Sequence, residues 1–268
     1  MLSLKLPKLN LLLRTLSTKK STVDPKQMEY FNEISEVWWD KQGVLKILHE
    51  MNDLRIPWIQ NRLREIDILK PNSNQAKPLE GLTILDVGCG GGILTEPLCQ
   101  LGAKVTGIDP NTKLLNIAKS RALQFNLTDL EYYCTTVEEH AEKHSNKYDV
   151  VTCFETIEHV REQDILTKFC VQCLKPGGSI FLTTNSKSWT SKLVFITLLE
   201  DLLRFFPSGT HQYEMFIDIN DLINLLEKEN CKVLFTKGMS YNPFSSKWTL
   251  VKNVNILNYV LHAVKFRS

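Results

Sequence analysis

Four glycines lie within the seven residues Asp86–Gly92, directly after a short apolar run, Leu82–Val87, and before a helical pattern from Ile93 to Leu101. Glycine at such a strand-to-helix turn lets the backbone turn sharply and lets a ligand contact the main chain. Asp109 follows Asp86 by 23 residues, at the end of the next apolar run, where a carboxylate can accept hydrogen bonds from a ribose. This order of strand, glycines, helix, strand and acid predicts a nucleoside-containing ligand rather than a purely structural turn.

The spacing of the glycines favours S-adenosylmethionine over a dinucleotide. When the dinucleotide fingerprint G-x-G-x-x-G is aligned at Gly88, Ile93 occupies the position of its third glycine. Asp86, just before the glycines, would repel a pyrophosphate, whereas S-adenosylmethionine carries an ammonium and a sulfonium and no phosphate. The sequence therefore predicts a methyltransferase-like site that includes Asp86, the backbone at Gly88 and Gly90, and Asp109.

Apolar runs of strand length alternate with helical patterns along much of the chain. This alternation predicts an α/β fold with a doubly wound, mostly parallel sheet, preceded by N-terminal helices and interrupted by a helical insertion. Residues 25–70 are expected to be helical, with a second helix from about Pro57 to Leu69, and the polar segment Pro71–Glu80 is expected to be a linker. The expected strands are 82–87, 104–108, 130–134, 148–154 and 179–184, and the expected later helices are 93–101, 112–125 and 161–174.

Residues 1–23 differ in charge from the rest of the chain. They contain five basic residues and no acid, whereas the remaining residues carry 27 bases and 30 acids. A basic, acid-free segment with interspersed hydroxyls is typical of an organelle transit peptide, and its apolar runs are too interrupted for a secretory signal. We expect mitochondrial import, the alternative being a basic N-terminus without a targeting role. The mildly acidic remainder argues against nucleic acid as the main partner.

The overall composition is that of a globular protein, with 43% hydrophobic and 23% charged residues, which excludes a disordered chain. The seven cysteines are odd in number and lie mostly in apolar surroundings, which favours buried thiols in a reducing compartment. Cys170 and Cys173 form a C-x-x-C pair within a helical pattern, and a redox or zinc role is the weaker interpretation of it.

Eleven segments of the chain, one of which contains the glycine loop, carry a specific resemblance to one protein family. They are Trp38–Asp40, Leu48–His49, Met51–Arg55, Leu85–Leu94, Thr136–Ala141, Tyr148–Cys153, Glu158–Val160, Leu174–Gly178, Gly209–His211, Tyr241–Pro243 and Asn258–His262. Over residues 28–262 the chain resembles the ubiquinone-biosynthesis O-methyltransferases, and with residues 1–23 it resembles their mitochondrial form. The resemblance implies a class I methyltransferase (Rossmann-like) fold, divided into a transit peptide (1–23), a helical cap and linker (24–80) and a methyltransferase domain (81–262).

The resemblance also implies a reaction. The family transfers a methyl group from S-adenosylmethionine to catechol-type hydroxyls of polyprenylated benzoate and quinol intermediates. Asp86 is then a candidate partner of the amino group of the cofactor, and Glu138 is a candidate for the edge of its adenine. Two alternatives keep the same fold: a methyltransferase acting on another small phenolic molecule, and a non-catalytic subunit that scaffolds a biosynthetic complex. The cofactor contacts that the resemblance implies are Arg55, Gly88, Asp109 and Phe154.

Arg55 can pair bidentately with the methionyl carboxylate. At Phe154 the main chain matters more than the side chain, and the alternative is a core aromatic. Glu155, Glu158 and His159 would share one face of a helix beginning at the end of the fourth strand. These three residues could bind a divalent ion that lowers the pKa of a phenol. The resemblance implies magnesium, although the histidine leaves zinc or manganese open; the alternative is His159, with Glu155, as a general base without metal.

An amphipathic segment, Trp189–Phe206, has a narrow polar stripe and a broad apolar face. Within the wider range 186–211 it is expected to form a lid that lies in a membrane interface, or else a buried helix that covers the sheet or the substrate pocket. A polyprenyl substrate favours the first interpretation. The expected location is the matrix side of the mitochondrial inner membrane, with membrane lipids and other ubiquinone-biosynthesis proteins as partners.

Overall fold

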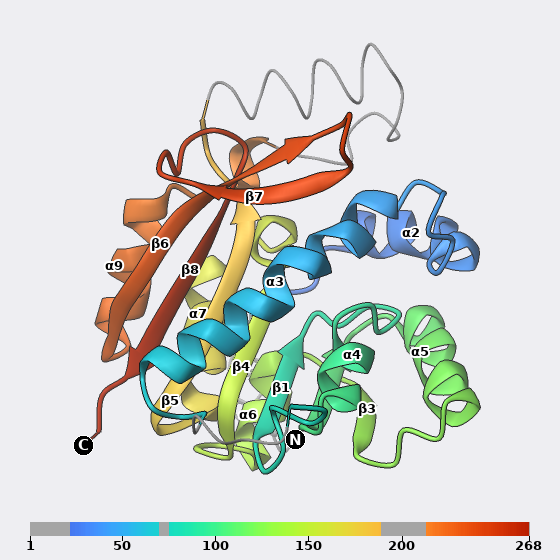
Figure 1. The fold of residues 1–268 in the computed structure, drawn as a ribbon, viewed down its shortest axis with the longest axis horizontal. Helices are drawn as coiled ribbons and strands as arrows, with labels where there is room; N and C mark the ends of the chain where they lie inside the picture. The colour runs from blue at the N-terminus through green and yellow to red at the C-terminus, as the bar shows by residue number, and fades with distance from the viewer. Residues whose placement is uncertain (1–21, 70–74, 189–212, 268) are drawn as a thin grey trace, which may run out of the picture.

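A computed structural model describes residues 22–69, 75–188 and 213–267 (Figure 1). The expected transit peptide, except for its last two residues, and the expected helix Trp189–Phe206 lie outside the described residues. The fold is built on one eight-stranded sheet with the strand order β3-β2-β1-β4-β5-β8-β6-β7. The strands are β1 (Thr83–Val87), β2 (Lys104–Asp109), β3 (Leu130–Cys134), β4 (Tyr148–Phe154), β5 (Leu174–Asn185), β6 (Cys231–Asn242), β7 (Lys247–Val251) and β8 (Asn258–Lys265).

The first five strands run parallel to one another, as the sequence predicted. β8 is inserted between β5 and β6 and runs antiparallel to both, and β7 is antiparallel to β6 at the far edge. The doubly wound, mostly parallel sheet is thereby confirmed. Because β8 begins where β5 ends, with Asn258 opposite Asn185, the start of β8 lies at the same sheet edge as the carboxyl ends of the parallel strands.

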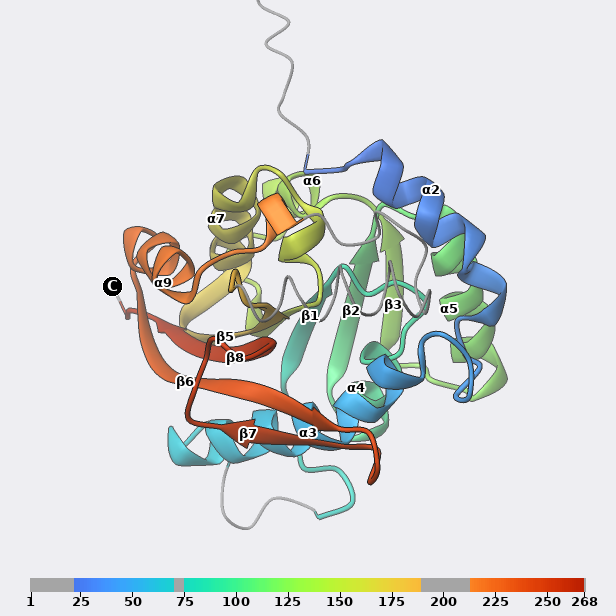
Figure 2. The ribbon, with the colours of Figure 1, turned by 90° about the horizontal axis from the view of Figure 1, so that it is seen from above.

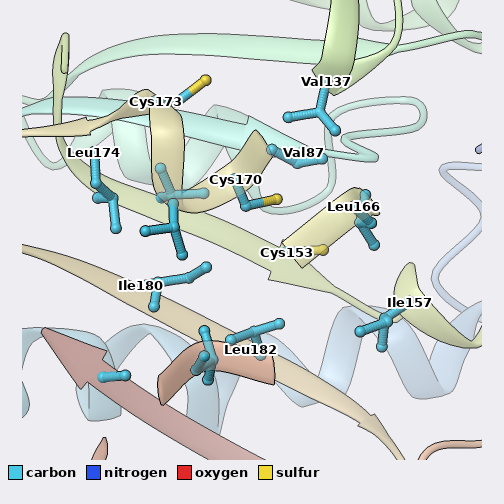
Figure 3. Close-up of a cluster of buried hydrophobic side chains, with 14 of the residues drawn as sticks. Val87, Val137, Cys153, Ile157, Leu166, Cys170, Cys173, Leu174, Ile180 and Leu182 are labelled. Atoms are coloured by element: carbon cyan, nitrogen blue, oxygen red, sulfur yellow. The ribbon is translucent and has the colours of Figure 1, made fainter. Parts of the chain in front are cut away.

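Helices cover both faces of this sheet. One hydrophobic core combines the sheet with α6, α7 and α9, and the other combines it with α3, α4 and α5. Figure 2 shows α3 and α7 on opposite sides of the sheet, and Figure 3 shows part of the first core, where Cys153, Cys170 and Leu182 come together. The α-helices are α2 (Pro25–Glu33), α3 (Lys46–Glu65), α4 (Thr95–Gln100), α5 (Thr112–Gln124), α6 (Val137–Lys143), α7 (Gln163–Cys173) and α9 (Ile219–Lys228), and the 3-10 helices are η1 (Ser35–Val37), η2 (Ile157–His159) and η4 (Tyr213–Met215).

Two predicted boundaries were wrong. Pro57 does not start a helix but lies inside α3, which continues because Trp58, Ile59 and Leu63 bury its inner face. The proline removes one backbone hydrogen bond, and this burial offsets the loss. β5 begins at Leu174 rather than at Ser179, because a register shift in its pairing with β4 admits the Pro-Gly-Gly segment into the strand.

The seven cysteines are free thiols, and six of them are buried. Cys170 and Cys173 lie on α7 and belong to the hydrophobic core. Within the described ranges, no helix combines the length and apolar character needed to cross a membrane.

Candidate active site

A cavity of about 780 Å³ opens at the carboxyl edge of the parallel strands. Its wall is formed by the turns after β1, β2 and β4, by the start of β8, and by α2 and the first half of α3. The structure brings together at this one cavity nine of the residues that the sequence singled out, and Glu138 is not among them. They are Arg55, Asp86, Gly88, Gly90, Asp109, Phe154, Glu155, Glu158 and His159.

The glycine loop is held by the backbone of the neighbouring strand. Gly88 has a φ of +72° and donates its N–H to the carbonyl oxygen of Ile108 at 2.9 Å. Gly90 has a φ of +52°, and a Cβ added there would lie 2.5 Å from the ring of Trp38. Trp39 donates its indole N–H to the carbonyl oxygen of Gly91 at 2.9 Å. The residues preceding α3 therefore close over the loop so tightly that only glycine fits.

Asp109 holds the glycine loop in place through the hydrogen bonds of its carboxylate. Its Oδ2 accepts a hydrogen bond from the N–H of Gly90 at 2.9 Å, and its Oδ1 accepts one from the N–H of Asn111 at 2.7 Å. The side chain is 9% exposed, and burial raises the pKa of Asp109 to about 6 despite these two bonds. Each carboxylate oxygen retains a second lone pair for a ligand.

Asp86 is a second buried carboxylate at the same cavity. Thr152 donates its hydroxyl to Oδ1 and Thr95 donates its hydroxyl to Oδ2, both at 2.8 Å. Burial raises the pKa of Asp86 to about 6, and the charge of Asp109 adds to the increase. Two buried carboxylates with raised pKa values favour a ligand that carries positive charge.

Arg55 supplies the cation of the site from α3. Its guanidinium is buried, and its Nε and Nη2 donate to Oδ1 of Asn52 at 3.2 and 2.9 Å. Nη1 lies 3.9 Å from Oε1 of Glu155, and the guanidinium carbon lies 5.1 Å from the ring centre of Phe154. Burial lowers the pKa of Arg55, and the nearby acids oppose that change. Two of its three nitrogens are already bonded, so a bidentate pair with a carboxylate would require Asn52 to give way.

The expected helix at the end of the fourth strand does not begin at Glu155. Glu155 has a φ of +48°, and only a single 3-10 turn, η2, follows it. The side chain is instead held by β5 and β8, because Thr183 donates to its Oε1 at 2.7 Å and Asn258 donates to its Oε2 at 3.2 Å. The prediction of three residues on one helical face was therefore wrong, although all three line the cavity.

Glu158 and His159 occupy different parts of this wall. Oε2 of Glu158 accepts a hydrogen bond from Thr184 at 2.8 Å, and burial, followed by the charge of Glu155, raises its pKa well above the usual range. The ring of His159 lies edge-on to Phe31 of α2, with 5.2 Å between ring centres. Among the described residues, no group of three or more histidine, cysteine, aspartate or glutamate side chains is placed to hold a metal ion.

Sequence patterns did not reveal the polar residues that hold these acids. Thr152, Thr183 and Thr184 lie in strands and donate to Asp86, Glu155 and Glu158, and only the pairing of β8 with β5 brings Asn258 and Asn185 together at the site. The available signal was the polar run Thr183–Ser186 at the end of the expected strand 179–184. Glu138, a candidate for adenine, has a different partner: its carboxylate accepts bonds from the N–H and the hydroxyl of Thr22 at 3.0 and 2.9 Å.

Comparison with known proteins agrees with this geometry. A family model described as "Methyltransferase domain" matches residues 57–235. The magnesium protoporphyrin IX methyltransferase of Synechocystis, solved with bound S-adenosylhomocysteine, superposes with a TM-score of 0.60 at 19% identity, covering 88% of this chain and 93% of that one. The fold and the site thus define a class I S-adenosylmethionine-dependent methyltransferase.

Curated relatives narrow the class further. The chain is 41% identical to the human mitochondrial ubiquinone biosynthesis O-methyltransferase, over 95% of this chain and 68% of that protein. It is 39% identical to the rat protein, with 95% and 73% covered, and 36% identical to that of Vibrio vulnificus YJ016, with 93% and 100% covered. The chain belongs to the ubiquinone biosynthesis O-methyltransferase family.

Proposed function

We propose that this protein transfers a methyl group from S-adenosylmethionine to a hydroxyl of polyprenylated catechols in ubiquinone biosynthesis, on both the dihydroxybenzoate and the demethylubiquinol intermediates. One observation carries the proposal. A single cavity joins the glycine loop and two buried acids, which suit the cofactor, to Glu155 and His159, which can handle the proton of a phenol. When bound, the cofactor supplies a methyl group that a phenolate oxygen can attack directly.

The cofactor end of the cavity is assigned to Arg55, Asp86, Gly88, Gly90, Asp109 and Phe154. Nη1 of Arg55, which faces Glu155 rather than Asn52, binds the carboxylate of the methionyl part. Asp86 binds the ammonium, and Asp109 accepts hydrogen bonds from the ribose. The Phe154 ring packs between Arg55 and Trp58, so its side chain supports the pocket wall while its main chain faces the ligand.

The catalytic end is assigned to His159 and Glu155. Both line the cavity, and either side chain can accept the proton of the hydroxyl that is methylated. Glu158, held by Thr184 and favoured in its protonated form by burial, supports Glu155 without acting as a base. The protein otherwise acts by orienting the two reactants and by excluding water from them.

The binding of magnesium by Glu155, Glu158 and His159 remains a proposal. The two glutamates are adjacent, but the histidine does not join them in a cluster, and the three donors as placed do not fit one ion. No step of the mechanism is therefore routed through a metal, and a chelator experiment decides the matter.

We expect the purified protein to methylate a prenylated dihydroxybenzoate from S-adenosylmethionine. The assay is run untreated, with EDTA, and with EDTA followed by excess magnesium. Activity that EDTA removes and magnesium restores would support the metal role of Glu155, Glu158 and His159. Activity indifferent to EDTA would leave His159 and Glu155 as bases. Tight cofactor binding without transfer to any catechol would contradict the proposed function and support the scaffold alternative.

Glu138→Gln is expected to leave the affinity for S-adenosylmethionine within about twofold of wild type and to lower the free energy of unfolding by about 1 kcal/mol. The physical reason is that the carboxylate of Glu138 accepts hydrogen bonds from the N–H and the hydroxyl of Thr22, so both measurements use the full chain, which contains Thr22. Isothermal titration calorimetry and urea unfolding measure the two quantities. A tenfold or larger loss of affinity would return Glu138 to the adenine site.

The proposed location is the matrix side of the mitochondrial inner membrane, with lipids and other proteins of the pathway as partners. Support comes from the acid-free composition of residues 1–23 and from the mitochondrial relatives. Fluorescent fusions of the full chain and of residues 24–268 test the targeting role. Mitochondrial fluorescence of both fusions would show that residues 1–23 are not the signal.

A further inference from the structure

Asn258, the first residue of β8, presents a buried hydrogen-bond acceptor at the cavity. Its side chain is 1% exposed, it lines the cavity, and its Oδ1 has no hydrogen-bond partner within residues 22–69, 75–188 and 213–267. A buried carbonyl oxygen without a partner costs stability, so native proteins retain one where a ligand or a water completes it.

The orientation of this amide is fixed by its neighbours. Its Nδ2 donates to Oε2 of Glu155 at 3.2 Å and to Oδ1 of Asn185 at 2.8 Å. The carboxylate oxygen of Glu155 and the amide oxygen of Asn185 both act as acceptors here, so the nitrogen of Asn258 faces them and its oxygen points away from them. The backbone of Asn258 is paired with Asn185 on one side and with Met239 on the other, which leaves the side chain little freedom to turn.

The position of β8 separates Asn258 from the cofactor residues. The glycine loop and Asp109 follow β1 and β2, whereas β8 lies beyond β4 and β5 in the strand order. At about 4.8 Å between strands, β8 is about 14 Å from β1. Glu155, at the end of β4, stands between the two. Asn258 therefore lines the part of the cavity that remains for the second reactant.

Resting on the proposed function, we propose that Oδ1 of Asn258 binds the catechol hydroxyl that is not methylated. An amide oxygen accepts a hydrogen bond but does not take the proton, so it suits a hydroxyl that keeps its hydrogen throughout the reaction. The methylated hydroxyl instead needs a base, and Glu155, bonded to the same amide, lies next to this acceptor. One amide thus positions a base through its nitrogen and recognises the adjacent hydroxyl through its oxygen, which makes Asn258 a specificity residue for vicinal diols.

The test compares kcat/KM for a prenylated 3,4-dihydroxybenzoate with that for the analogue in which the second hydroxyl is replaced by hydrogen. Wild type is expected to prefer the diol by about 10- to 100-fold, because the analogue leaves a buried acceptor unpaired. Asn258→Ala is expected to reduce this preference to about twofold or less. Asn185→Ala is the matched control, since it removes a partner of Nδ2 but leaves Oδ1 in place, and it should keep the preference even if both rates fall.

Calorimetric titration with S-adenosylmethionine verifies that each variant is folded, and Asn258→Leu replaces Asn258→Ala if the smaller side chain unfolds the protein. A preference unchanged in the Asn258 variant, or lost equally in both variants, would overturn the inference. So would a wild-type enzyme that does not discriminate, a result that needs no variant. Failure of wild type to methylate the diol at all would instead overturn the proposed function.

Discussion

Gly88→Ala is expected to weaken S-adenosylmethionine binding by at least about 100-fold, equivalent to about 3 kcal/mol. A Cβ at this position would lie 2.4 Å from Oγ1 and 2.6 Å from Cγ2 of Thr156. Thr156 cannot move aside easily, because its hydroxyl donates to the carbonyl oxygens of Phe154 and Val87 at 2.9 and 3.3 Å. The clash must therefore open the carboxyl edge between β1 and β4, where the cofactor would lie.

Gly81→Ala is the matched control. Gly81 has a φ of +85°, close to the +72° of Gly88, but a Cβ there would meet no atom within 4 Å. Both variants incur the free-energy cost of a side chain in the left-handed backbone region, about 1–2 kcal/mol, and only Gly88→Ala adds the steric clash with Thr156. Affinity from isothermal titration calorimetry should be unchanged in Gly81→Ala. Adding Thr156→Ala to Gly88→Ala should restore about tenfold of the loss, since the contact with Cβ of Thr156 at 3.0 Å remains. Normal binding by Gly88→Ala would contradict this account of the loop.

The part of the fold that the sequence predicted depends on local signals. Strands β1 to β5 are short apolar runs bounded by turn residues, and the glycines after β1 mark the crevice. Their parallel order follows from the alternation with helices. β6, β7, β8 and α9 were not predicted, because β6 is only half-buried and its pairing with β8 is a contact between distant parts of the chain.

The residues of the candidate site likewise fall into those that local sequence signals predicted and those that they did not. Asp86, Gly88 and Asp109 were predicted from spacing along two consecutive strands, and the structure places them at one cavity. The geometry of Glu155 was not predicted, because its left-handed backbone and its bonds to Thr183 and Asn258 arise from three strands that meet only in the folded sheet. Periodicity describes one element at a time, so it extended a helix through a residue that tertiary contacts hold in a turn.

Asp86→Asn is expected to stabilise the ligand-free protein at pH 7.5 while weakening S-adenosylmethionine binding by about 100-fold or more. The pKa of Asp86 is raised from its ordinary 3.8 to about 6 in the folded state, so the folded protein binds the proton more tightly than the unfolded chain. The favourable contribution is complete below pH 4 and is lost as the pH rises through 6, a difference of about 3 kcal/mol. Asparagine does not titrate, so the variant should lack this loss. Its partners Thr95 and Thr152 are hydroxyls that can rotate to accept from an amide.

Asp109→Asn has the same charge change but should be less stable than wild type at pH 5. Burial likewise raises the pKa of Asp109 to about 6, but its two oxygens accept from the N–H groups of Gly90 and Asn111, which can only donate. An amide nitrogen must then face one of these N–H groups, at a cost of about 1–3 kcal/mol. Urea unfolding at pH 5 and pH 7.5, with titration calorimetry of the cofactor, separates the two cases. When the pH is raised from 5 to 7.5, the stability of Asp86→Asn relative to wild type should increase. Asp109→Asn should be destabilised at pH 5. At that pH the carboxyl group of wild-type Asp109 is largely protonated, yet its second oxygen still accepts a hydrogen bond. Equal destabilisation by both substitutions at pH 5 would show that Asp86 is kept for folding. Stabilisation by Asp86→Asn at pH 7.5, together with its weaker cofactor binding, would show that the buried charge of Asp86 is retained at the expense of stability, because the ammonium of the cofactor requires it.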